Sequence, residues 1–167
     1  QAVRAIGLHH GPVHAECRVN DAGVFVLEAA ARPIGGLCAR ALIFERNGEV
    51  ASLEDLLLSH ALGEDITGWQ REPSASGVMM IPIPRPGVFR GARHVDAARS
   101  VPGISDIQIT AKIDQRLVPL PEGASYLGFI FAHGPDGNVV EKALRQAHAR
   151  LVFDVDTELR VIESPHG

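Results

Sequence analysis

Apolar and polar side chains alternate along two short segments near the start of the chain, residues 12–20 and 24–30. A period of two is typical of β-strands that bury one face. Residues 21–23 between them supply a three-residue loop, in which Gly23 can take the left-handed bulge position. These features predict a β-hairpin.

The length of this loop decides which side chains face each other across the hairpin. A four-residue loop would place Glu16 and Glu28 on opposite faces, because a shift of one residue turns every side chain over. With a three-residue loop these two glutamates lie directly opposite each other. The same register sets two further pairs, Asn20–Val24 and Arg18–Val26.

Helical spacing of the apolar residues follows the hairpin. Residues 37–45 are apolar enough for a mostly buried helix, which residues 46–48 would end. Ser52 is a suitable N-cap for a second helix, and the acidic residues after it suit the helix dipole. Gly63 would stop that helix. Its buried stripe would consist of Leu53, Leu56, Leu57, His60 and Ala61.

The polar, turn-forming segment 70–77 separates this region from a second, β-rich one. We therefore expect two domains, over residues 1–70 and 77–167. Strands are predicted at 78–83, 104–113, 125–132, 151–155 and 158–162, and a short extended piece at 117–121. Asn138 is expected to cap a helix with one apolar face, formed by Val140, Leu144, Ala147 and Leu151. The predicted fold class is α+β: an antiparallel hairpin with helices, then a small β-rich module with one helix.

The composition is that of an ordinary globular protein. The 167 residues are 46% hydrophobic and 22% charged, which suits one domain or two small lobes. A net charge of -4 gives no support for nucleic-acid or membrane partners. The sequence has no apolar run of about 18 residues and no signal peptide, so we expect a soluble, cytoplasmic protein. Cys17 and Cys38 are too few for a disulfide framework or a zinc site.

The two opposed glutamates are the strongest candidates for chemistry. Carboxylates paired across a hairpin, with Cβ atoms roughly 5 Å apart, repel each other. At an effective dielectric of about 20 the repulsion amounts to several kcal/mol, unless a cation lies between them or one of them keeps its proton. Oxygen donors without nearby thiolates favour a hard ion such as Mg²⁺. Glu16 and Glu28 are therefore candidate metal ligands; the alternative is a solvated hairpin face neutralised by Arg18.

The residues around this pair resemble a known family. Residues 11–16 (Gly-Pro-Val-His-Ala-Glu), 26–28 (Val-Leu-Glu) and 31–36 (Ala-Arg-Pro-Ile-Gly-Gly) resemble the metal-binding end of the ATP-grasp ligases. Within that superfamily they are most similar to the L-amino acid ligase and biotin-carboxylase-like branch. Residues 117–132 and the helix at 139–151 resemble the C-terminal module of those enzymes, although less specifically.

The resemblance implies roles for individual residues. Glu16 and Glu28 match two acids that hold Mg²⁺ (or Mn²⁺) against the phosphates of ATP. Arg32 matches an arginine that binds the substrate carboxylate or the acyl-phosphate. Gly35 and Gly36 match a tight loop at which substrate approaches the backbone.

In such a ligase, ATP phosphorylates a carboxylate and an amine then attacks the acyl-phosphate. The resemblance implies that this chain is a C-terminal fragment, inactive alone, of an enzyme acting on ATP and small carboxylate and amine substrates. The family's glycine-rich phosphate loop and ATP-contacting lysines lie upstream of the motif, whereas Lys112 and Lys142 fall in the second half here. Ala30 replaces an asparagine common in the family, which leaves a second metal ion open.

Two other interpretations remain. The chain could be a non-catalytic regulatory or dimerisation module that retains the hairpin, and a homodimer is compatible with the sequence. Among enzymes, a fragment of a carboxylase or of a purine-pathway ATP-grasp enzyme would carry the same motif. The sequence therefore does not decide whether the chain by itself is an enzyme.

Overall fold

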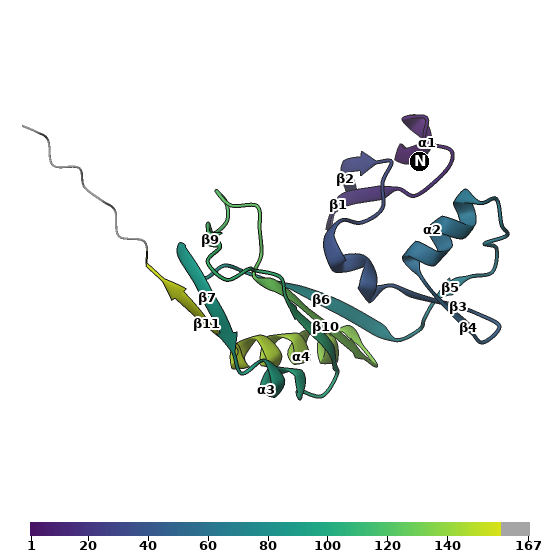
Figure 1. Cartoon of the computed structure of the whole chain (residues 1–167). Coiled ribbons are helices and arrows are strands. Elements are labelled where there is room, and N and C mark those ends of the chain that lie inside the picture. Colours follow the sequence, from purple (N-terminus) through teal and green to yellow (C-terminus); the bar gives the residue numbers. More distant parts are fainter. Residues whose placement is uncertain (158–167) are drawn as a thin grey trace, which may run out of the picture. The chain divides into compact units, whose positions relative to one another are not determined.

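The computed structural model describes residues 1–157 and divides the chain into two compact units, Gln1–Pro73 and Ser74–Gly167. Figure 1 shows the first unit in purple and blue, and the described part of the second in teal to yellow. The strand expected at 158–162 lies outside the described residues. The functional assignment of the two expected domains stays a prediction.

The first unit opens with a short helix, α1 (Ala2–Ala5), and the predicted hairpin of β1 (His14–Asn20) and β2 (Gly23–Ala30). The hairpin loop is shorter than expected, because Asn20 pairs with Gly23. The Ala22 N–H donates to Asn20 Oδ1 at 2.9 Å, so an asparagine side chain closes the turn. The expected pairs of Asn20 with Val24 and Arg18 with Val26 are therefore wrong.

A β-bulge corrects the register farther along the hairpin. Cys17 pairs with Val26, but Glu16 pairs with Glu28, which leaves Leu27 as the extra residue. Because a bulge sets two residues against one, it restores the alignment that the shorter loop would have shifted. The direct pairing of Glu16 with Glu28 is confirmed, although by another route than the predicted loop.

The helix expected at residues 37–45 is wrong. A 3₁₀ helix, η1 (Gly36–Ala41), is followed by the strand β3 (Ile43–Arg46), which pairs with β4 (Glu49–Ser52). The turn between these strands is Asn47–Gly48, with φ values of 53° and 84°. Two left-handed residues are the signature of a tight hairpin turn, and this local signal outweighs the apolar composition. The short β5 (Gln70–Arg71) completes a sheet of order β4-β3-β5.

The second predicted helix is confirmed as α2 (Leu53–Ala61), and Ser52 is its N-cap. The Asp55 N–H donates to Ser52 Oγ at 3.1 Å, and the Ser52 N–H donates to Asp55 Oδ2 at 2.9 Å. The Ser52 hydroxyl also donates to Asp55 Oδ2, at 2.7 Å, and together with the Ser52 N–H it holds the pKa of Asp55 below its ordinary value. The predicted stripe is only half-buried at Leu53, Leu56, Leu57 and His60, and Ala61 is exposed, so the prediction is wrong at that last position.

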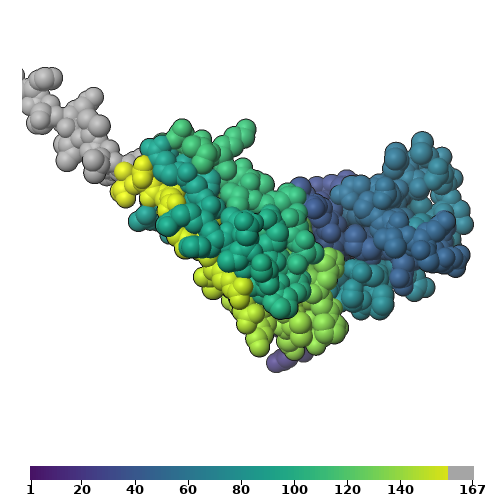
Figure 2. All heavy atoms as spheres, turned by 60° about the horizontal axis from the view of Figure 1, so that its bottom comes forward, coloured from purple at the N-terminus to yellow at the C-terminus, as the bar shows by residue number. Residues whose placement is uncertain are grey.

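The second unit consists of two antiparallel sheets and two helices. One sheet has the order β6-β10-β8 and the other the order β11-β7-β9. The strands are β6 (Ala75–Ile81), β7 (Gly87–Arg93), β8 (Ile104–Ile109), β9 (Arg116–Leu117), β10 (Gly128–Gly134) and β11 (Val152–Asp156). In the space-filling view of Figure 2, β11 (yellow) runs beside its partner β7 (teal). The α+β class with antiparallel sheets is confirmed.

Helix α4 (Gly137–Arg150) packs on the β6-β10-β8 sheet. Its N-cap is Asp136 rather than the expected Asn138, because Asp136 Oδ1 accepts from the Val139 N–H at 2.9 Å. The predicted apolar face is buried: it comprises Val140, Leu144, Ala147 and Leu151. Beneath it lie fully buried side chains that include Ile81 and Ile130. These residues form the hydrophobic core of the second unit.

A strand and a helix of the second unit were not expected from the sequence. These are β7, the central strand of its sheet, and the short helix α3 (Val95–Arg99). Arg90 on β7 forms ion pairs with Asp114 and with Asp156, the second through Nε and Oδ2 at 2.7 Å. Arg93 bonds Asp154 at 3.0 Å in the same way. These arginines therefore connect β7 with β11. Among the described residues, no helix combines the length and apolar character needed to cross a membrane.

Candidate metal-binding site

The predicted site lies on one face of the β1–β2 hairpin. Glu16 stands opposite Glu28, and His14 stands opposite Ala30 two pairs farther along. Because residues two apart along a strand point to the same face, both carboxylates and the His14 imidazole share it. The two glutamates are exposed and His14 is half-buried. The hairpin therefore presents two carboxylates to solvent at cross-strand distance.

Arg32 joins this pair from the segment after β2. Its backbone N–H bonds the Ala30 carbonyl at 2.9 Å, which turns the chain back toward the hairpin. Its Nη2 donates to Glu28 Oε1 at 3.3 Å, with both side chains about half exposed (50% and 51%). A guanidinium at this position offsets part of the repulsion between the carboxylates. Its remaining N–H groups can fork onto an incoming anion.

Gly35 and Gly36 differ in what they require of the backbone. Gly36 has a φ of 63°, a conformation that favours glycine, and it begins η1. Gly35 is extended, with a φ of −83°, and a Cβ built on it would meet nothing within 4 Å. Only Gly36 is therefore needed for the local fold. The open space at Gly35 leaves its backbone accessible.

The donor set fits a hard divalent cation better than a zinc ion. Within residues 1–157 no three His, Cys, Asp or Glu side chains gather as a potential metal cluster. Mg²⁺ commonly uses one or two carboxylates and fills its remaining positions with water and substrate phosphates. The pair of Glu16 and Glu28 matches that requirement in number and in ligand type. The side chain of Ala30 adds no oxygen donor to this face.

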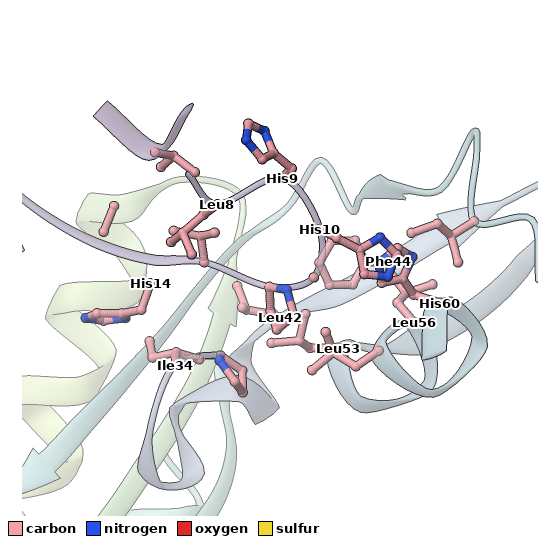
Figure 3. Close-up of a pocket in the computed structure, with 18 residues that line it drawn as sticks. Leu8, His9, His10, His14, Ile34, Leu42, Phe44, Leu53, Leu56 and His60 are labelled. Carbon is pink, nitrogen blue, oxygen red and sulfur yellow. The ribbon is translucent and has the colours of Figure 1, made fainter. Parts of the chain in front are cut away.

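An apolar cavity of about 690 Å³ adjoins the hairpin inside the first unit (Figure 3). His14 and Ile34 lie at one end, and His10 and His60 lie at the other. The rings of His10 and His60 stand 4.3 Å apart between centroids. The cavity draws its lining from segments throughout residues 3–66, so sequence periodicity did not identify it. In the sequence, only the apolar stripe of α2 indicated a surface that could line such a cavity.

The fold of this chain is similar to the folds of enzymes whose structures have been solved. It is similar to the structure of an L-amino acid ligase from Bacillus licheniformis, with a TM-score of 0.75 and 23% identity. It is also similar to phosphoribosylglycinamide synthetase from Anaerococcus prevotii, with a TM-score of 0.69 and 14% identity. Each comparison covers 93% of this chain and 39% of the other chain. The chain therefore shares its fold with part of each of these two enzymes.

A sequence comparison agrees with the structural likeness to an L-amino acid ligase. Residues 79–156 match the family model for L-amino acid ligase C-terminal domain 2. A relative from Sinorhizobium fredii, "Uncharacterized protein y4rH", is 22% identical over 150 residues, which are 88% of this chain and 30% of that protein. The predicted resemblance to the C-terminal part of an ATP-grasp ligase is confirmed. The chain spans less than half the length of the proteins it matches, and the family match does not include Glu16, Glu28 or Arg32.

Proposed function

We propose that this chain is the C-terminal part of an ATP-dependent carboxylate–amine ligase of the amino-acid-ligase type. It would contribute residues that bind Mg²⁺ and the phosphates of ATP. The supporting observation is the cross-strand pairing of Glu16 with Glu28, with Arg32 bonded to Glu28. The match of residues 79–156 to the family model for L-amino acid ligase C-terminal domain 2 supports a ligase context for the chain.

In the proposed function, Glu16, Glu28 and Arg32 have different roles in phosphoryl transfer. A bound divalent metal offsets negative charge on the phosphate oxygens. Glu16 and Glu28 would hold it from opposite strands, so the rigidity of the hairpin fixes its position. Arg32 would exchange its contact with Glu28 for an anionic oxygen of the substrate carboxylate or acyl-phosphate, onto which its guanidinium forks.

The isolated chain is expected to turn over ATP weakly or not at all. Its only lysines, Lys112 and Lys142, both belong to the second unit. The hairpin unit therefore has no lysine to contact the nucleotide phosphates. In the proposed enzyme, these groups would come from another part of the polypeptide.

The test is Glu28→Gln in a ligase polypeptide that contains these residues. Phosphate release is measured with ATP, Mg²⁺ and pairs of amino acids, and in parallel with bicarbonate. We expect the substitution to abolish ligation while the circular dichroism spectrum stays unchanged. Glu45→Gln, an exposed glutamate on β3, is the matched control and should keep activity. Unchanged activity of Glu28→Gln would refute the metal assignment, and phosphate release with bicarbonate alone would favour a carboxylase.

A further inference from the structure

The apolar cavity of the first unit begins where the charged face of the hairpin ends. His14 lines the cavity and also lies on the same face of β1 as Glu16. Two residues along a strand are roughly 7 Å apart. Pro33 and Ile34, which follow Arg32 directly, also line the cavity, and Ile34 lies at the same end as His14 (Figure 3). A small molecule whose anionic group lies beside Arg32 therefore has the cavity within reach of a short side chain.

The lining of the cavity selects for an apolar group. Its walls include aliphatic and aromatic side chains from β3 and α2, among them Phe44, Leu53 and Leu56. Its volume of about 690 Å³ is within the usual range for small-molecule sites, which are mostly apolar with few polar groups. The polar groups here are imidazoles, and the His10 and His60 rings offer flat faces against which an aromatic group can pack.

We infer that this cavity receives the apolar side chain of the substrate carboxylate, a branched aliphatic or aromatic group of about leucine or phenylalanine size. The inference rests on the proposed function, because that function places the carboxylate beside Arg32 and the metal. The cavity would then act as the specificity pocket of the site. Its occupant is a small organic acid.

The test uses the 167-residue chain itself with three probes: acetate, 4-methylpentanoate and 3-phenylpropionate. Binding is measured by NMR titration of the leucine methyl and imidazole resonances. Burying an apolar group of this size strengthens binding by about 10- to 100-fold, so both larger probes should bind that much more tightly than acetate. The shifts should concentrate on Leu56 and His60, which line the cavity.

Two substitutions on one helix supply the matched control. Leu56→Trp fills the cavity and should weaken binding of the larger probes at least tenfold. Leu58→Trp adds the same bulk at a position 61% exposed and should leave binding unchanged. Because Leu56→Trp could also disturb α2, Leu56→Ala is measured as well. It enlarges the cavity and should shift the preference toward 3-phenylpropionate.

Mn²⁺ added to the same samples separates this inference from the proposed function. If Mn²⁺ binds the hairpin while all three probes bind equally weakly, the cavity inference is overturned and the cavity is a packing space for other polypeptide. If the larger probes bind in the cavity but Mn²⁺ does not bind, the proposed metal site fails and the pocket stands. Equal loss of probe binding in Leu56→Trp and Leu58→Trp would also overturn the inference.

Discussion

Gly77→Ala tests how closely α4 packs on its sheet. A Cβ at Gly77 would lie 2.6 Å from Val140 Cγ1 and 3.1 Å from Leu144 Cδ1. Since carbon atoms prefer separations of about 3.5–4.0 Å, the helix or the Val140 side chain must move by about 1 Å. Overpacking of this kind costs about 1–3 kcal/mol, and alanine returns about 0.5–1 kcal/mol through reduced backbone entropy. We expect a net loss of about 0.5–2 kcal/mol in unfolding free energy.

Urea unfolding followed by circular dichroism measures this loss. Gly91→Ala is the control, because Gly91 also lies in a strand but has nothing within 4 Å of its Cβ position. That variant should be neutral or slightly stabilised. Adding Val140→Ala to Gly77→Ala removes the clashing methyl groups, so the two substitutions should couple by at least about 0.5 kcal/mol. A Gly77→Ala chain as stable as the wild type, or additive effects in the double variant, would refute this packing.

Two further predictions concern local electrostatics. Ser52→Ala should destabilise the chain by about 0.5–2 kcal/mol in urea unfolding, since it removes the N-cap of α2. Because the pKa of Asp55 is lowered on folding, its contribution is present above the ordinary carboxyl range and lost as pH falls below about 4. Asp55→Asn should remove that part of the acid dependence, and an unchanged pH profile would contradict it. Arg90→Ala should lower the melting temperature slightly, and by less at high salt, because its partners Asp156 and Asp114 are exposed. An equal decrease at low and high salt would argue against the ion pairs.

Elements with a clear hydrophobic period were predictable from the sequence. The hairpin strands, the Ser52 cap and the buried face of α4 all follow from the spacing of apolar and capping residues. The prediction failed where a short local signal decided the outcome. Asn47–Gly48 forms a hairpin turn and converts an apolar stretch from helix to strand. Strand β7 contains two glycines and two arginines, which interrupt the apolar–polar alternation, so its central place depends on pairing with distant segments.

The sequence indicated which two acidic residues pair at the candidate site, but not the backbone geometry that brings them together. Pairing of Glu16 with Glu28 was expected, yet it depends on the bulge at Leu27, which no loop rule indicated. The contact of Arg32 with Glu28 was also unexpected, because Arg32 was assigned to a substrate anion. Both features arise from tertiary geometry: a bulge and a turn at residues 30–32 bring together side chains that sequence spacing alone leaves apart.

Paramagnetic broadening by Mn²⁺ tests the central claim most directly. In the wild-type chain, Mn²⁺ should selectively broaden the amide resonances around Glu16 and Glu28, and excess Mg²⁺ should reverse the effect. Glu16→Gln should abolish the broadening, whereas Glu45→Gln should retain it. Absence of broadening at the hairpin, or broadening that persists in Glu16→Gln, would contradict the assignment of these two glutamates as metal ligands.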